Sequence, residues 1–166
     1  MPEVVRENGE KRAGRPFPWW CPNCRKKAVY RATMPYRLSI LHDGQHHEVE
    51  VPELGVPRCA ECGELVFDNQ ADDDINRVFR SQIRLLQPEQ IRAGRIGLGL
   101  SEKELAARLG VPEATILAWE DGLQIQSRAM DNLLRVYFAL PQVRRALVGV
   151  DQDPNLGTNV VTAAVE

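Results

Sequence analysis

The sequence predicts an α+β protein in which a small N-terminal β domain precedes an all-α domain, and three observations support this prediction. Two cysteine pairs, Cys21/Cys24 and Cys59/Cys62, bracket a segment in which apolar and polar residues alternate with the period of a strand. From Ala71 onward, apolar residues instead recur with the period of a helix. The 166 residues, 43% hydrophobic and 27% charged, suffice for two small globular domains.

Changes of period and composition predict five segments along the chain. We expect a mobile tail, a zinc-ribbon domain, a linking helix, a helix-turn-helix and dimerisation domain, and a second tail, over residues 1–16, 17–69, 70–87, 88–149 and 150–166 respectively. The linking helix would begin with acidic Asp72 to Asp74, where the helix dipole favours negative charge. Its apolar residues follow at helical spacing: Ile75, Val78, Phe79, Ile83 and Leu86.

The β domain is predicted to contain a two-stranded hairpin. The stretch YRLSILHDGQHHEVEV, residues 36–51, alternates on both sides of Asp43-Gly44. This dipeptide suits a turn with positive φ at both central positions. Pro52, Gly55 and Pro57 are expected to end the second strand.

The cysteines follow a C-x2-C-x34-C-x2-C pattern, which predicts a metal site. Two intervening residues let both sulfurs of a tight knuckle reach one ion, and two knuckles complete a tetrahedron. Because four cysteines leave no open position for water, we expect one structural Zn²⁺ per chain, held by Cys21, Cys24, Cys59 and Cys62. Iron in a rubredoxin-like centre uses similar knuckles, and a redox pair of reactive thiols is a further alternative.

Two other groups of residues lie near these motifs. His42, His46 and His47 surround the predicted turn, as ordinary polar side chains or as a second metal site. Trp19 and Trp20 directly precede the first knuckle and either pack into a small core or form a partner-binding aromatic patch.

The sequence pattern of the helical domain predicts five helices, over 88–97, 101–109, 112–121, 127–140 and 141–148. Ser101 and Glu104 have capping-box spacing, and Gly110 and Gly122 stand where helices end. A small residue at a close helix crossing, followed by a glycine turn, is typical of a helix-turn-helix. The inward positions are Ile91, Ile96, Leu100, Leu105, Ala106, Leu109, Val111, Ile116 and Trp119.

Residues 19–148 resemble the MqsA-type antitoxins, also described as YgiT-type zinc-finger proteins with an Xre-like helix-turn-helix. The resemblance rests on CPNC and CAECGE, on PEQIRAGRIGLGLSEKELAARLGV, on W-E-x-G, and on SRAMDNLLRVYFALPQVRRAL. It implies that the four cysteines bind zinc, that the C-terminal domain dimerises on palindromic operator DNA, and that the zinc domain contacts a toxin where one exists. By motif position, the groove-facing residues are Glu113, Ala114, Leu117 and Ala118, while Ser101 and Glu102 begin the helix that anchors on phosphate.

The chain departs from the family pattern at two places that bear on DNA. Glu102 replaces a glutamine beside phosphate, and Leu117-Ala118 replaces a polar pair before the tryptophan. In one interpretation the helix still enters the major groove, and phosphate contacts come from Lys103, Arg92, Arg95, Arg128 and the basic N-terminal tail. In the other, the apolar helix face meets protein, and the domain is an interaction adaptor.

The last long helix bears on oligomeric state. Its inward residues are predicted to be Met130, Leu133, Leu134, Tyr137 and Leu140, and Val136 and Phe138 widen the apolar face. This width suits either a buried core helix or a two-fold contact. The resemblance favours a homodimer.

No nucleophile–base pair or phosphate-binding glycine loop is recognisable, so we expect neither an enzyme nor a small-molecule substrate. The absence of a signal peptide and of a long apolar run predicts a cytoplasmic protein without membrane contact. The leading hypothesis is a zinc-containing, dimeric DNA-binding repressor of antitoxin type that binds double-stranded DNA and, where one exists, a toxin.

Overall fold

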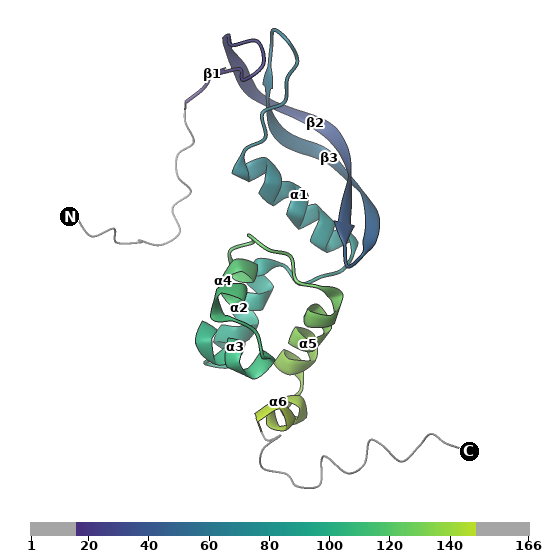
Figure 1. Ribbon diagram of the computed structural model, residues 1–166, viewed down its shortest axis with the longest axis vertical. Helices are drawn as coiled ribbons and strands as arrows, with labels where there is room; N and C mark the ends of the chain where they lie inside the picture. The colour runs from purple at the N-terminus through teal and green to yellow at the C-terminus, as the bar shows by residue number, and fades with distance from the viewer. Residues whose placement is uncertain (1–15, 149–166) are drawn as a thin grey trace, which may run out of the picture. The chain divides into compact units, whose positions relative to one another are not determined.

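The computed structural model describes residues 16–148. Within them, three strands precede six helices, which confirms the predicted α+β class (Figure 1). The elements are β1 (Trp19–Trp20), β2 (Lys27–His42), β3 (Gln45–Cys59), α1 (Asn69–Gln82), α2 (Pro88–Gly97), α3 (Glu102–Leu109), α4 (Glu113–Glu120), α5 (Arg128–Ala139) and α6 (Pro141–Val148). Apart from Pro16, the predicted tails lie outside the described residues.

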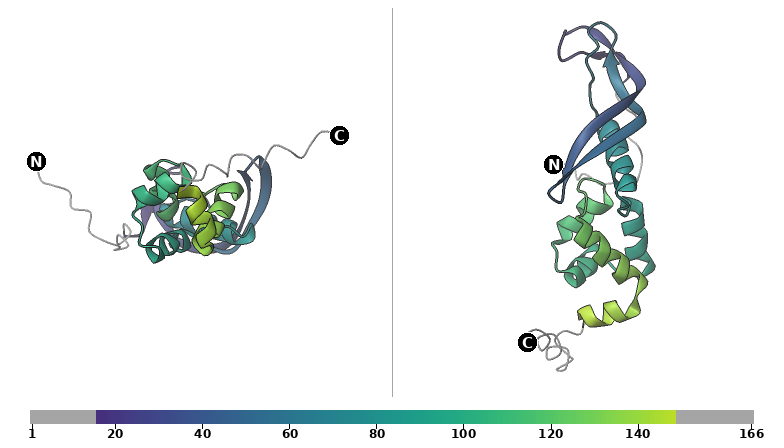
Figure 2. Two further views of the ribbon diagram at one scale, coloured as in Figure 1. Left: turned by 90° about the horizontal axis from the view of Figure 1, so that it is seen from below. Right: turned by 90° about the vertical axis from the view of Figure 1, so that its right-hand side faces the viewer.

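The strands form one antiparallel sheet in the order β1-β2-β3. Asp43 and Gly44 both have positive φ, 50° and 76°, so the predicted hairpin turn is confirmed. The two long strands make a strongly twisted ribbon, which is clear in the right-hand view of Figure 2.

The hairpin is longer than the alternating pattern predicts. β2 begins at Lys27, and β3 continues through Pro52, Gly55 and Pro57 to Cys59, so the expectation that these residues end the strand is wrong. β3 lies at the edge of the sheet, where proline is tolerated because an N–H directed away from the partner strand is not needed. The extension brings Cys59 to the end of the hairpin that carries the first knuckle.

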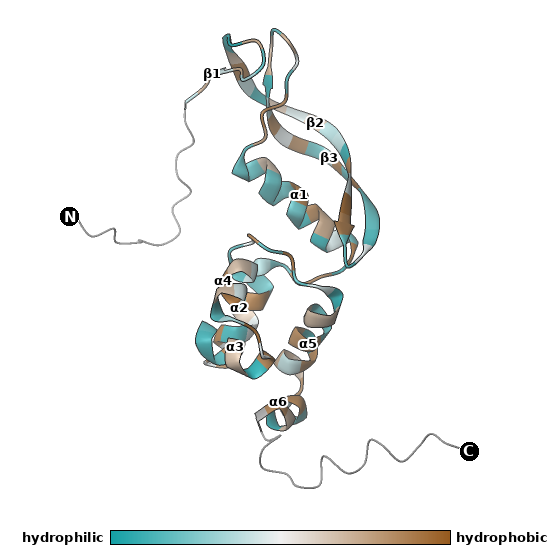
Figure 3. Ribbon diagram, viewed as in Figure 1, coloured by the Kyte–Doolittle hydropathy of each residue, from teal (hydrophilic) through white to brown (hydrophobic). Residues whose placement is uncertain are grey.

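The chain divides into two compact units. Among the described residues, the first unit comprises 16–36 and 51–74, and the second comprises 37–50 and 75–148. In the first unit, α1 begins on a markedly hydrophilic turn (Figure 3), and the Asp68 carboxylate accepts a hydrogen bond from the Ala71 amide at 3.0 Å.

In the second unit, the hairpin tip is attached to helices. The Asp43 carboxylate accepts a hydrogen bond from the Arg128 amide at 2.6 Å, in the first turn of α5. The Gln82 side chain at the end of α1 donates to the Glu48 carbonyl at 2.7 Å. The predicted linking helix thus ends at Gln82, and the left-handed Arg84 (φ 56°) turns the chain toward α2.

The helical core confirms most of the predicted inward positions. Its buried residues are Ile91, Leu105, Ala106, Leu109, Ile116, Trp119, Leu134 and Tyr137, with Leu100, Val111, Met130 and Leu133 partly buried against them. Two positions are wrong, because Ile96 is 60% exposed and Leu140 is 44% exposed. On α2 the core-facing place four residues after Ile91 belongs to Arg95, while Leu140 is already the C-cap of α5.

Candidate metal centre and helix-turn-helix

The two cysteine knuckles have the same backbone design. The amide of the first cysteine bonds to the carbonyl five residues later, Cys21 to Lys26 and Cys59 to Glu64, each at 2.8 Å. The amide four residues on bonds back to the cysteine carbonyl at 3.0 Å in both knuckles. That fourth residue has a left-handed backbone in each case, Arg25 at φ 57° and Gly63 at φ 78°. The C-x2-C spacing therefore folds twice into one local structure.

The four sulfurs gather as a single tetrahedral site requires. All four Sγ atoms lie within 4.8 Å of one another. Contacts of 3.5 Å between Cys21 and Cys62, and of 3.7 Å between Cys24 and Cys59, join one knuckle to the other. A tetrahedron with metal–sulfur bonds of about 2.3 Å has edges of roughly 3.8 Å. The cluster therefore fits a structural metal such as Zn²⁺, and the cross-knuckle contacts favour one four-thiolate site over two separate redox pairs.

Further hydrogen bonds hold the knuckles together. The Ala60 amide donates to the Ala28 carbonyl at 2.8 Å, which ties the second knuckle to β2. Lys26 pairs with Glu61 at 2.5 Å, and the Asn23 side chain donates to Glu64 at 3.3 Å. The Lys26 pair is solvent-exposed, so it orients the knuckles more than it stabilises them.

The Cys24 and Cys59 thiols differ in pKa without a metal. Backbone amide bonds from Cys62 and Glu61, together with thiol hydrogen bonds, lower the pKa of Cys59 to about 7 against the opposing effect of burial. At Cys24 the Lys26 amide acts to lower the pKa, but burial and hydrogen bonds with the other thiols raise it to about 12. A bound cation would favour ionisation of all four thiols at neutral pH.

The histidines do not join such a cluster. Within residues 16–148, the four cysteines are the only group of three or more potential ligands gathered closely enough for an ion. His42 and His47 each pack edge-on against Phe79, with ring centroids 5.5 Å apart. His46 is exposed. The two packed histidines are part of the contact between the hairpin tip and α1.

The two tryptophans before the first knuckle have different surroundings. Trp19 is half-buried, stacks on Phe17 with ring centroids 4.3 Å apart, and packs against the small core around Cys21, Val29 and Cys59. Trp20 is 61% exposed. Trp19 therefore fits the role of packing into a small core, whereas the exposure of Trp20 fits a partner-binding aromatic patch.

The segment predicted as a helix-turn-helix folds into two short helices around a tight turn. The capping box is confirmed, because the Glu104 amide donates to Ser101 Oγ at 3.2 Å and the Ser101 amide donates to Glu104 at 2.8 Å. Gly110 ends α3 with φ 70°, as predicted. Of the residues expected to face a groove, Glu113, Ala114 and Leu117 are exposed and Ala118 is partly exposed.

A buried ion-pair network behind α4 is not apparent from the sequence pattern. Glu120, whose side chain is 1% exposed, binds Arg95 at 2.7 Å and Arg92 at 3.2 Å. Arg95 also binds Glu102 at 2.7 Å, which balances the carboxylate expected beside phosphate. A glutamate directly after the core tryptophan, with two arginines one helical turn apart on α2, was the available signal.

These contacts bear on the residues expected to bind phosphate. Arg92 and Arg95 are held by internal ion pairs. Arg128 donates to the carbonyls of Ile83 and Arg84 and lies 3.8 Å from the buried Asp131 carboxylate. Ser101 and Lys103 are exposed at the start of α3. Ser101 and Lys103 are thus accessible to solvent, whereas Arg92, Arg95 and Arg128 are engaged in contacts within the chain.

Asp131 is a further buried group that the apolar pattern did not reveal. It is fully buried and accepts hydrogen bonds from the Leu86 amide at 2.7 Å, from Gln126 at 3.0 Å and from Arg135 at 2.7 Å. It therefore joins α5 to the segment before α2.

No protein-family model and no curated protein matches the chain. Within residues 16–148, no helix is long and apolar enough to cross a membrane.

Proposed function

We propose that the chain is a zinc-containing, dimeric DNA-binding transcriptional regulator of antitoxin type. The observation that carries the proposal is the combination of a four-cysteine cluster with a helical unit in which α3, the Gly110 turn and α4 leave a row of outward side chains uncovered. Such a row is what a recognition helix needs to approach base edges.

The outward row offers its own chemistry for base reading. Ala114, Leu117 and Ala118 suit the methyl groups of thymine, and Glu113 can accept from a cytosine amino group. In the Arg95–Glu102 pair, the arginine balances the negative charge that would otherwise repel phosphate at the start of α3. Dimerisation through α5 would double the small phosphate footprint of Ser101 and Lys103.

Zinc is the metal we assign to the cluster. Four thiolates at tetrahedral spacing suit Zn²⁺, and a closed site gives it a structural role. Metal analysis tests this directly: one zinc per colourless chain supports the assignment, whereas a red protein that contains iron contradicts it.

Gel-shift assays with two variants of α4 test the DNA proposal. The DNA probe is the duplex sequence that in vitro selection enriches from random DNA. Ala118→Arg adds a cation to the groove-facing row and is expected to strengthen DNA binding generally. Glu113→Ala is expected mainly to relax the preference at one base pair, worth about 1–3 kcal/mol. Unchanged gel shifts for both variants would place α4 outside the groove.

A partner toxin belongs to the same proposal. Co-expression with the product of a neighbouring gene, followed by purification through a tag on this chain, tests it. A stable complex that suppresses growth arrest by that product supports the antitoxin role.

An interaction adaptor without DNA binding is the second candidate, and specific observations favour it. Leu117 is 43% exposed on α4, and Arg92, Arg95 and Arg128 are engaged within the chain. If the protein does not bind duplex DNA even at low salt, this result would support the adaptor over the regulator.

A further inference from the structure

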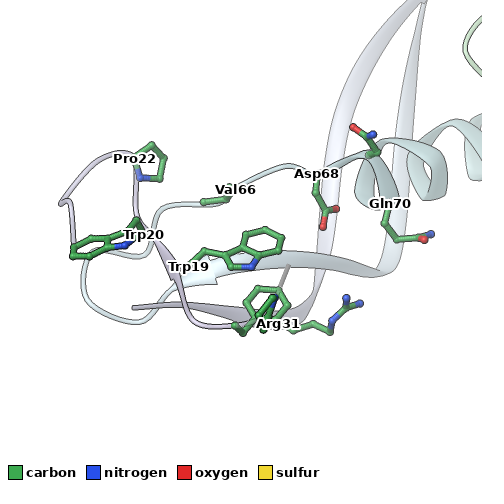
Figure 4. Close-up of a pocket in the computed structure, with 10 residues that line it drawn as sticks. Trp19, Trp20, Pro22, Arg31, Val66, Asp68 and Gln70 are labelled. Carbon is green, nitrogen blue, oxygen red and sulfur yellow. The ribbon is translucent and has the colours of Figure 1, made fainter. Parts of the chain in front are cut away.

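A pocket of 710 Å³ opens in the first unit beside the cysteine knuckles. Figure 4 shows Trp19, Trp20, Pro22 and Val66 around it, with Asp68 at the end formed by the start of α1. Its volume falls within the roughly 300–1,000 Å³ of ligand-binding pockets. Aromatic and apolar groups dominate this pocket.

Two of the three aromatic rings that line this pocket form a stack with a cation at one end. Phe17 and Trp19 are nearly parallel, with an interplanar angle of 16°. The Arg31 guanidinium carbon lies 5.7 Å from the centre of the Phe17 ring. Trp20, 61% exposed, lies directly across from Lys27 in the β1–β2 pair. An exposed indole therefore lies next to a cation on neighbouring strands.

A second pocket of 380 Å³ shares Arg31 with the first. Arg58 and the half-exposed Tyr30 also line it, and no carboxylate does. Among the described residues of the first unit, Lys26 has an ion-pair partner in Glu61, whereas the other cations make no ion pair: Arg25, Lys27, Arg31 and Arg58. Arg58 Nε donates to the Gly63 carbonyl at 3.3 Å, but no carboxylate within residues 16–148 neutralises any of the four cations, so their charge remains available to an anionic ligand.

Aromatic rings interleaved with unpaired cations match the chemistry of single strands of nucleic acid. Unstacked bases pack against indole and phenol rings regardless of sequence, and arginine and lysine bind the phosphates between them. A duplex offers no free base faces to such rings, and an apolar peptide would leave the cations unused. We propose that this ribbon surface, formed by Phe17, Trp19, Trp20, Tyr30, Arg31 and Arg58, binds single-stranded nucleic acid.

The distribution of charge determines the path of the bound strand along the ribbon surface. Asp68 lies at one end of the aromatic pocket, and Asp72 and Asp73 are exposed in the next turn of α1. These carboxylates repel phosphate, so the strand runs from Trp20 past Arg31 toward Arg58. A base stacks on Trp20, and successive phosphates lie on the two arginines.

Fluorescence anisotropy of the full-length, zinc-loaded protein tests the proposal with a labelled oligothymidylate or oligouridylate of about 15 nucleotides, the upper site size of a small domain. We expect binding in about 50 mM salt that weakens as salt is raised. Trp20→Ala should lower the affinity roughly 5- to 150-fold, the range of one base–aromatic stack. Replacing Arg31 and Arg58 together with alanine should weaken binding and reduce the salt slope.

Matched controls separate this surface from the rest of the chain. Arg37→Ala removes an exposed β2 arginine that pairs with Glu50 at 2.8 Å, and it should leave affinity within about twofold. Ala118→Glu on α4 should abolish the duplex binding of the proposed regulator and leave single-strand binding intact. Zinc content verifies that each variant is folded.

Several outcomes would overturn the proposal. They are no oligonucleotide binding by zinc-loaded protein, binding that survives both Trp20→Ala and the double arginine variant, and equal binding of a mononucleotide and the longer strand. Binding of an apolar peptide but not of an oligonucleotide, with the peptide binding lost in Trp20→Ala, would identify a protein-binding surface instead.

Discussion

Arg25 and Gly63 occupy equivalent places in the two knuckles, yet only one of them is glycine. Both have a left-handed backbone, which costs roughly 1–2 kcal/mol for a residue with a Cβ atom. The second knuckle avoids this cost and the first does not.

The Arg25→Gly variant should therefore be more stable by about 0.5–1 kcal/mol, since glycine relieves the strain but adds freedom to the unfolded chain. Gly63→Ala should be less stable, because it introduces the same strain. Urea unfolding of the zinc-loaded protein measures both, and a destabilised Arg25→Gly would refute the equivalence of the knuckles.

Glu120 illustrates a polar residue that holds a helical core together. Its carboxylate is buried with Arg95, and removing one partner of a buried pair leaves an uncompensated charge. Glu120→Ala should lower the free energy of unfolding by about 3–5 kcal/mol. The matched control is Glu89→Ala, whose exposed pair with Arg77 should contribute less than about 1 kcal/mol.

Glu104 gives a pH-dependent contribution. Hydrogen bonds from the Ser101 amide and hydroxyl hold its pKa below the usual 4.5. A lowered folded-state pKa stabilises the fold above the unfolded value, and this contribution is lost as pH falls through the folded value. The wild type should exceed Glu104→Gln in stability at pH 7, and the difference should shrink below pH 4.5. A pH-independent difference would contradict this.

At the scale of elements, the sequence predicted what local chemistry determines. The Asp43-Gly44 turn, the Ser101 cap and the Gly110 stop depend on residues close in sequence, and all three are present. The strand ends were not predictable in the same way, because tolerance of Pro52 and Pro57 depends on β3 lying at an edge.

Residues whose role depends on distant partners also escaped the sequence patterns. Ile96 fits the apolar period, but its neighbour Arg95 is buried because Glu120, 25 residues away, pairs with it. Asp131 is buried because the Leu86 amide and Gln126 satisfy it. For the candidate site, the cysteine spacing predicted the cluster, whereas the pocket beside Trp20 depends on the start of α1 and was not foreseen.

The end of the first unit that carries the four cysteines has a very small apolar core around Cys21, Val29 and Cys59. So small a core requires an additional constraint, and structural zinc contributes roughly 10–16 kcal/mol of apparent binding energy. Chelation should unfold this end and leave the helical core around Leu105 and Ile116 intact. Far-ultraviolet circular dichroism should retain its helical signal while tryptophan fluorescence changes, because Trp19 packs against this core. Simultaneous loss of the helical signal would contradict independent stabilisation.

At the scale of the whole molecule, a β unit with a four-cysteine cluster precedes a helical unit proposed to read duplex DNA. The proposal depends on the exposed row of Glu113, Ala114 and Leu117, which is poor in cations. A dimer compensates for this by presenting the row twice, so the recognised sequence should be palindromic.

In vitro selection on random duplex DNA with the zinc-loaded protein is the most direct test of this central claim. We predict enrichment of a palindrome whose half-sites lie one helical turn apart, about 10 base pairs centre to centre. Substitution of Glu113 should change the base preference within each half-site. A pool that remains random after selection at low salt would contradict the assignment as a DNA-binding regulator.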